Sequence, residues 1–137
     1  MREIKFRAWD NIEERMLPVE NINFREQHIS LDEGDNSVTD TFEMFELTQF
    51  IGVRDKHGTE IYEGDIVTAH SEGYCGKFEI KMREDGGGSP TWLLYPAWQN
   101  YESWCIKARR EEDGLIYDRG LEIIGNIYEN KNLLRGV

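Results

Sequence analysis

Hydrophobic and polar residues alternate in short runs along most of the chain, which is the pattern of β-strands rather than of helices. Each run is bounded by Asp, Asn, Gly or Pro, the residue types that turns favour. The pattern predicts a predominantly β protein of the α+β class. The clearest runs are residues 4–9, 21–24, 28–31, 77–83, 92–95 and 121–128.

Residues 48–67, TQFIGVRDKHGTEIYEGDIV, carry the most specific local pattern. Two strand-like flanks enclose Lys56-His57-Gly58-Thr59, which predicts a hairpin closed by a type I turn with Gly58 at positive φ. Gly64 then permits a sharp turn into an apolar strand that begins near Ile66. Both glycines therefore support a β architecture.

The first third of the chain predicts shorter strands. Residues 4–9 suit an edge or half-buried strand that remains available for pairing with another chain. Residues 15–17 suit its return partner, and Pro18, which has no amide hydrogen, is expected to end that partner. Residues 32–37 hold no apolar anchor and predict a mobile loop. Residues 42–47 fit a helical turn or a strand, and we favour the strand.

The later residues predict a second set of strands. Residues 65–70 and 77–83 suit a hairpin across a turn at residues 73–76, with Phe78, Ile80 and Met82 on one face. The glycine-rich residues 84–90 are expected to form the most flexible loop. An aromatic concentration follows, which we expect to pack under a loop or along a subunit face. Its members are Trp92, Trp98, Tyr101 and Trp104.

The end of the sequence predicts one further strand and a turn. Residues 107–113 change from basic to acidic and are expected to be exposed. Gly125 predicts a bulge or a close approach within the strand at residues 121–128. Asn130 suits the start of a final helical turn.

Length and composition predict one compact domain spanning residues 1–137, because no linker rich in Pro, Gly or Ser divides the chain. The turn at Gly64 resembles those of small barrels, so we expect a strongly bent, SH3-like or partly open barrel sheet with short helical turns. The charged start and the lack of a long apolar run predict a cytoplasmic protein without a membrane partner.

Charge is unevenly distributed along this acidic chain, which has 16 basic and 27 acidic residues and a net charge of −11. Residues 20–46 contain eight acidic residues and only Arg25 as a basic one. Such a face repels a phosphate backbone, so direct nucleic-acid binding is not expected. A solvated surface that maintains solubility explains the segment more simply than a functional acidic face does.

Three motifs resemble the YopX-like proteins of bacteriophages and prophages. They are REIKFRAWD at the start, IGVRDKHGTEIYEGDIV in the centre and IIGNIYENKNLL near the end, in this order and spacing. The third motif has Lys131 where proline is frequent in the family. The resemblance implies a phage-encoded, predominantly β protein of the α+β class that self-associates in the bacterial host cytoplasm. It implies no catalytic residues.

Four acidic residues near the central hairpin, Asp55, Glu60, Glu63 and Asp65, could supply oxygen ligands to magnesium or calcium. Turns also collect Asp and Glu without a metal, and the alternating acids of a calcium loop are missing. We therefore favour a structural role for all four residues. Asp65 is expected to accept hydrogen bonds from backbone amides after Gly64.

The remaining reactive residues form no recognisable motif. Among the three histidines no two are four residues apart. Cys75 and Cys105 are far apart and form no CxxC pair, so two reduced thiols are favoured over a zinc site. A disulfide between them is a less favoured alternative. The glycines at 86–88 lack the following GK[ST] of a phosphate-binding loop. We assign no catalytic, cofactor-binding or metal-binding residue. The histidines are His28, His57 and His70.

Three functions remain open from the sequence. The first is a non-enzymatic scaffold that binds itself and a host or phage protein. The second is a metal-assisted phosphodiesterase or nuclease that uses Glu63, Asp65 and another acid. The third is an acidic mimic of nucleic acid, which would compete with DNA for a basic protein. The absence of a convergent catalytic set favours the scaffold over an enzyme.

Overall fold

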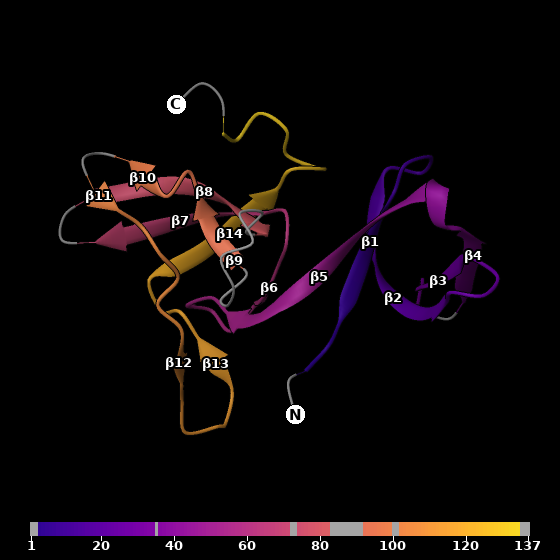
Figure 1. Ribbon diagram of the computed structural model, residues 1–137, viewed down its shortest axis with the longest axis horizontal. Helices are drawn as coiled ribbons and strands as arrows, with labels where there is room; N and C mark the ends of the chain where they lie inside the picture. The colour runs from indigo at the N-terminus through magenta and orange to yellow at the C-terminus, as the bar shows by residue number, and fades with distance from the viewer. Residues whose placement is uncertain (1–2, 35, 72–73, 83–91, 100–101, 135–137) are drawn as a thin grey trace. The chain divides into compact units, whose positions relative to one another are not determined.

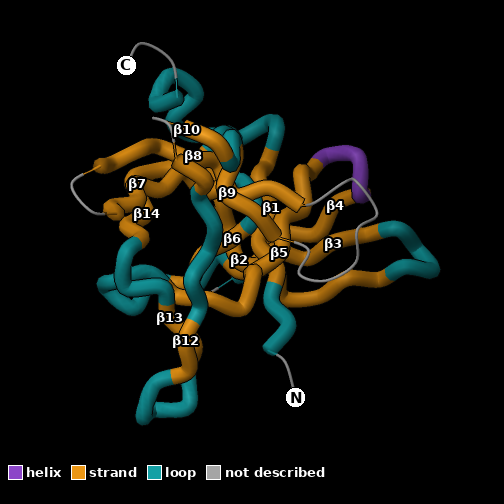
Figure 2. Tube along the Cα trace, turned by 60° about the vertical axis from the view of Figure 1, so that its left-hand side comes forward, coloured by secondary structure: helices purple, strands orange, loops and turns teal. Residues whose placement is uncertain are grey.

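The computed structural model describes residues 3–34, 36–71, 74–82, 92–99 and 102–134. Its regular structure is β apart from one short 3-10 helix, Phe42–Met44, coloured purple in Figure 2. The prediction of a predominantly β protein is confirmed. Residues 84–90, Arg83 and Tyr101 lie outside the described residues, so the predictions for them stay predictions. No helix in the described ranges is long and apolar enough to cross a membrane.

Contacts divide the chain into two compact units, residues 1–50 and 51–137. The first unit holds β1 (Phe6–Asp10), β2 (Arg15–Asn23), β3 (His28–Asp32), β4 (Ser37–Thr41) and the start of β5 (Phe45–Arg54) (Figure 1). These strands pair in the order β5-β1-β2-β3-β4, and all the pairs are antiparallel. Ala8, Ile29, Leu31 and Phe45 form the buried core of this unit.

Two sequence predictions in this unit are wrong. Strand β1 is not an available edge, because β2 pairs with one side of it and β5 with the other. Strand β2 does not end at Pro18 but continues to Asn23. Pro18 lies opposite Arg7 at the last pair with β1, and the next residue, Val19, pairs with β3 instead. A proline is therefore tolerated where one ladder gives way to the next.

Residues 42–47 contain both of the structures considered for them. The 3-10 turn Phe42–Met44 comes first, and β5 begins directly after it at Phe45. Strands β3 and β4 pair in register up to Asp32 and Ser37. The loop predicted at residues 32–37 is thus shorter than expected, since both of its ends belong to strands.

The second unit holds the end of β5 and the remaining strands: β6 (Glu60–Tyr62), β7 (Asp65–Ser71), β8 (Tyr74–Met82), β9 (Trp92–Tyr95), β10 (Trp98–Gln99), β11 (Glu102–Ser103), β12 (Arg109–Arg110), β13 (Ile116–Tyr117) and β14 (Leu121–Asn126). Four of them form an antiparallel sheet in the order β14-β7-β8-β9. No pairing among the described strands closes a sheet into a barrel. The SH3-like or partly open barrel and the single domain stay predictions.

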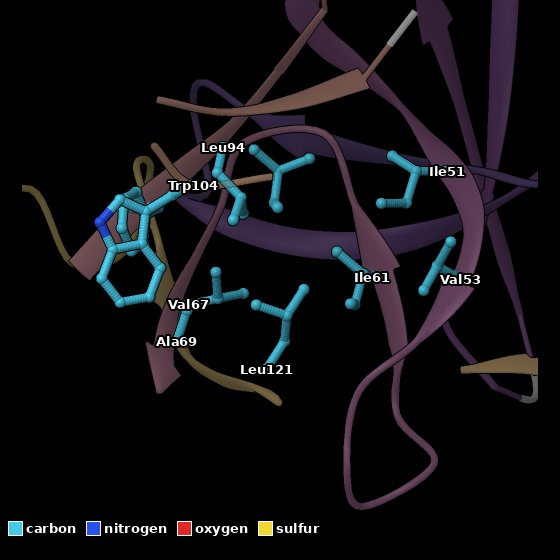
Figure 3. Close-up of a cluster of buried hydrophobic side chains, with 10 residues drawn as sticks. Ile51, Val53, Ile61, Val67, Ala69, Leu94, Trp104 and Leu121 are labelled. Atoms are coloured by element: carbon cyan, nitrogen blue, oxygen red, sulfur yellow. The ribbon is translucent and has the colours of Figure 1, made fainter. Parts of the chain in front are cut away.

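A cluster of buried apolar side chains lies against one face of the four-stranded sheet (Figure 3). Phe78 and Ile80 of β8 and Val67 of β7 are completely buried in it, as their alternation in the sequence predicts. Met82, which was expected on the same face, is 46% exposed at the end of β8. The rings of Phe78 and Trp104 pack 5.0 Å apart between centroids.

The central hairpin has the predicted geometry. Gly58 has φ of +82°, and Asp55 and Thr59 are joined by a backbone hydrogen bond of 2.9 Å. Gly64 has φ of +87° and lies directly before β7. Strand β14 also shows the expected irregularity, because its register with β7 shifts between Ile123 and Gly125.

In the described residues up to Leu134, no helix begins at Asn130, where one was predicted. The Asn130 amide donates to the Asn126 carbonyl and the Leu133 amide donates to the Asn130 carbonyl, which gives successive turns. The Asn130 side-chain oxygen accepts a hydrogen bond from the Asn126 amide at 3.2 Å. This side chain therefore holds the chain back against the end of β14 rather than starting a helix.

Replacing Gly58 with valine is expected to destabilise the protein by about 1–3 kcal/mol, because a β-branched residue is strained at positive φ. A new Cβ would lie 3.9 Å from Tyr117, so collision is not the cause. Thermal unfolding measures the effect. Gly58→Asn is the control, because asparagine tolerates the left-handed region better. An unchanged melting temperature for the valine variant would contradict the assigned turn.

Candidate functional site

Asp55 is held entirely by backbone amides of the second unit. Its side chain is 1% exposed. One carboxylate oxygen accepts hydrogen bonds from the amides of His57 at 2.9 Å and Thr59 at 3.0 Å. The other oxygen accepts from the amide of Ile123 in β14 at 3.0 Å. The carboxylate thus closes the hairpin turn and attaches it to the sheet.

The neighbouring acids Asp65 and Glu60 also make structural contacts. Asp65 is 1% exposed and accepts a hydrogen bond of 2.8 Å from the amide of Tyr62. That amide precedes Gly64, whereas the sequence prediction placed the bonded amides after it. Glu60 pairs with Arg54 at 3.2 Å across the hairpin. Within the described ranges, no three His, Cys, Asp or Glu side chains are grouped so that they could hold a metal ion.

Glu63 and Glu79 are the half-buried acids near the same turn. Burial raises the pKa of Glu63 above its ordinary value, and the negative charge of Glu79 raises it further. Burial also raises the pKa of Glu79, while the nearby Lys81 opposes that rise. The charge of Glu79 therefore acts on Glu63, which makes Glu79 a candidate for the additional acid of the nuclease hypothesis. Two carboxylates alone do not define a metal site.

The substitution Glu79→Gln is expected to lower the pKa of Glu63, because it removes the repelling charge. A ¹³C NMR titration of the Glu63 carboxyl measures this shift. The pKa values of Glu63 and Glu79 in the folded protein are both above the ordinary glutamate pKa. The contribution of these two groups to the free energy of unfolding is therefore fully present below the ordinary pKa, and it is lost as pH rises through the folded-state pKa values. Glu79→Gln should therefore weaken this loss, by less than about 1 kcal/mol after solvent screening. The exposed Glu112→Gln is the control, and an unmoved Glu63 titration would contradict the coupling.

The second unit also contains an open cleft of about 460 Å³. Its buried lining residues are Ala69, Trp104, Tyr117, Asp118 and Leu121. Its polar lining comes from the end of β7, from residues 103–111 and from the connection between β13 and β14. These polar residues are His70, Ser103, Lys107, Arg109, Glu111, Tyr117, Asp118 and Arg119.

Asp118 joins two walls of this cleft. It is 5% exposed, and its two carboxylate oxygens accept hydrogen bonds from the amides of Lys107 at 2.7 Å and Gly120 at 2.9 Å. The Asp118 amide in turn donates to the carbonyl of Arg54 in β5 at 2.8 Å. Asp118 therefore has a structural role and positions the backbone of Lys107 at the rim.

A bonded group of side chains fixes one side of the rim. Arg119 donates to both carboxylate oxygens of Glu111, and its guanidinium lies 4.0 Å from the centre of the Tyr117 ring. This pairing lowers the pKa of Glu111 and keeps the carboxylate ionised. A third nitrogen of Arg119 donates to the Lys56 carbonyl at 3.0 Å. The charges of Glu111 and Arg119 are thus largely compensated by each other.

The cleft brings together three reactive side chain types that are separated in the sequence: His70, Ser103 and Cys105. The described hydrogen bonds include none that joins Cys105 or Ser103 to His70, and the Asp118 oxygens are bonded to backbone amides. A base held by an orienting acid next to a nucleophile is therefore not assembled there. Neither Cys75 nor Cys105 is in a disulfide, and both residues are exposed.

The other predicted residues lie apart from this cleft or only partly within it. His57 bonds to Glu122 at 2.9 Å and His28 lies at the start of β3. Among the aromatic residues, Trp104 is buried and lines the cleft, whereas Trp98 is 65% exposed. Residues 107–113 are largely exposed, as predicted.

Sequence reasoning missed the cleft and its basic residues. The sequence offered a partial signal: Ser103, Cys105, Lys107, Arg109 and Glu111 all line the cleft, although Trp104 between the first two lines it as well. The opposite wall could not be found in this way, because it comes from His70 and Gly120, which a backbone hydrogen bond of 3.4 Å joins.

The fold and the cleft define a β-rich protein whose buried acids stabilise turns and whose cleft carries many polar side chains. The chain belongs to the YopX family, because the family model described as YopX protein matches residues 5–135. The resemblance found in the sequence is thereby confirmed. No match was found among the curated proteins.

The chain is also similar to a solved structure, the crystal structure of protein EF1440 from Enterococcus faecalis. The two sequences are 26% identical, and the TM-score is 0.63. The similarity covers 98% of this chain and 100% of the other. It therefore includes residues of both compact units.

Proposed function

We propose that the chain is a phage- or prophage-encoded accessory protein that acts as a non-enzymatic, self-associating interaction scaffold in the bacterial cytoplasm. The observation that supports this function is the use of the turn carboxylates. Asp55, Asp65 and Asp118 accept hydrogen bonds from backbone amides and are almost fully buried. Carboxylates held in this way stabilise loops and are poorly placed to bind a catalytic metal.

Self-association is supported by exposed aromatic side chains and by sheet edges. Trp98 is 65% exposed and Phe24 is 76% exposed. In the described sheets, β4 and β9 each pair with a single strand, so they replace β1 as the candidate edges. A strongly bent, SH3-like or partly open barrel sheet would suit this role, since such folds favour binding over catalysis.

Sedimentation is expected to find a homo-oligomer at micromolar protein concentration, and Trp98→Ser is expected to weaken it because exposed aromatic area is lost. Leu115→Ser is the matched control, since Leu115 is apolar and only 37% exposed. A strictly monomeric wild-type protein across this range would refute self-association. A partner other than a second copy should present a basic or aromatic surface.

The enzyme alternative makes a different prediction. The purified protein is expected neither to bind DNA nor to cleave it with added magnesium, because its net charge of −11 opposes phosphate. A gel-shift and nuclease assay at low salt is the stringent test, since low salt exaggerates electrostatic binding. Cleavage that is abolished by Glu63→Gln or Asp65→Asn in a folded protein would establish the phosphodiesterase or nuclease instead.

An acidic mimic of nucleic acid is the second candidate, and one observation favours it. All seven described acidic residues within residues 20–46 are exposed, and one of them, Glu33, forms an ion pair with Arg15, so the first unit carries concentrated negative charge. A mimic should release duplex DNA from poly-lysine, and this release should weaken when these acids are replaced by their amides. Equal release by the neutralised variant would exclude the mimic.

A further inference from the structure

Lys107 and Arg109 form a cationic pair on one wall of the cleft. Both side chains line the cleft and are exposed. They are two residues apart in the sequence, and Arg109 is the first residue of β12. In the part of the chain that the structure describes, neither side chain makes an ion pair.

The acidic residues of the cleft do not neutralise this pair. Glu111 is held by two hydrogen bonds from Arg119, and Asp118 has both oxygens bonded to backbone amides. The carboxylate oxygens of Glu111 and Asp118 are therefore already occupied by other donors and have little capacity left to pair with Lys107 or Arg109. Two uncompensated cations beside a concave surface are unusual on a chain with a net charge of −11.

The position of the pair is fixed by the fold. The Lys107 amide is bonded to the buried Asp118, and Arg109 pairs with Tyr117 in the β12–β13 ladder. Because the backbone here is already anchored, binding does not have to order it. The cleft volume of about 460 Å³ lies within the roughly 300–1,000 Å³ of small-molecule sites.

We propose that this cleft binds a ligand through an oxyanion, either a carboxylate or a phosphate, held by Lys107 and Arg109. The planar guanidinium of Arg109 suits two-point binding of such a group, and the ammonium of Lys107 adds a second charge. The body of the ligand lies along the wall that contains Trp104. The site goes beyond the scaffold function and does not depend on self-association.

NMR titration of the whole ¹⁵N-labelled protein tests the site with inorganic phosphate and with succinate. Both probes are expected to give saturable shifts at the amides of Lys107, Arg109 and Gly120. Succinamide, which is neutral and similar in shape to succinate, is expected to give none. Tighter binding of phosphate assigns a phosphate-bearing ligand, tighter binding of succinate assigns a carboxylate, and equal binding assigns a site for either. No saturable shift with either anion, or equal shifts with succinamide, would overturn the proposal.

Substitutions provide matched controls. Lys107→Gln combined with Arg109→Gln is expected to weaken anion binding about tenfold or more, because both charge-assisted contacts are lost. Arg110→Gln changes the neighbouring residue of β12, whose guanidinium donates to the Gly114 carbonyl and does not line the cleft. Combined with Lys131→Gln it gives the same change in net charge, and this control is expected to bind as tightly as wild type. Equal weakening by the two double variants would show nonspecific attraction and overturn the site.

Discussion

Replacing Asp55 with alanine is expected to be among the most destabilising changes of a single polar side chain, by about 2–4 kcal/mol. The variant leaves three backbone amides without their acceptor, those of His57, Thr59 and Ile123. Water can reach the turn at the exposed His57, but the Ile123 amide lies in a strand beside the buried core. Chemical denaturation measures the loss in the free energy of unfolding.

Two comparisons separate this bond network from a general effect of charge. Asp55→Asn retains one oxygen and should recover part of the stability, because the side chain can still close the turn. Glu112→Ala removes an exposed carboxylate and should change stability by less than about 0.5 kcal/mol. An Asp55→Ala variant as stable as the Glu112→Ala variant would refute the structural role assigned to Asp55.

Replacing Gly125 with valine is expected to destabilise the protein by about 3 kcal/mol, because the side chain has no room. A Cβ at this position would lie 2.5 Å from Asn130 Oδ1 and 2.6 Å from Leu133 Cδ1. The side chains of Asn130 and Leu133 must therefore shift, which disturbs the hydrogen bond from the Asn126 amide to Asn130 Oδ1. Thermal unfolding measures the loss, and limited trypsin digestion at Lys131 should become faster.

Gly120→Ala is the control for a glycine with more space, since the nearest atom to its new Cβ would lie 3.4 Å away. It should be the milder change. If Gly125→Val leaves both the melting temperature and the rate of digestion at Lys131 unchanged, the close packing of Asn130 and Leu133 on β14 is wrong.

The local features that sequence reasoning identified are those that a few neighbouring residues determine. Gly58 and Gly64 have the positive φ that their turns require, and Gly125 lies at the strand irregularity. Backbone preferences of glycine act over two or three residues, so one sequence suffices to find them. The alternation that buries Phe78 and Ile80 is likewise local.

The features that were missed depend on residues far apart in the sequence. β1 is interior because residues 45–49 return to pair with it, which its own alternation does not indicate. Pro18 ends pairing with β1 but not the strand, because β3 supplies a new partner. The cleft similarly requires His70 to meet Gly120. Such contacts are set by tertiary packing rather than by local propensity.

The order of strand pairing has a consequence for folding during synthesis. β1 to β4 find all their partners within residues 6–49, so this part can pair as soon as that stretch has left the ribosome. In the second unit, β7 gains its neighbour on one side only when β14, residues 121–126, has been made. A nascent chain that stalls before that point exposes the unpaired edge of β7, together with apolar residues that are buried in the complete fold. Such a chain is expected to bind chaperones or to aggregate.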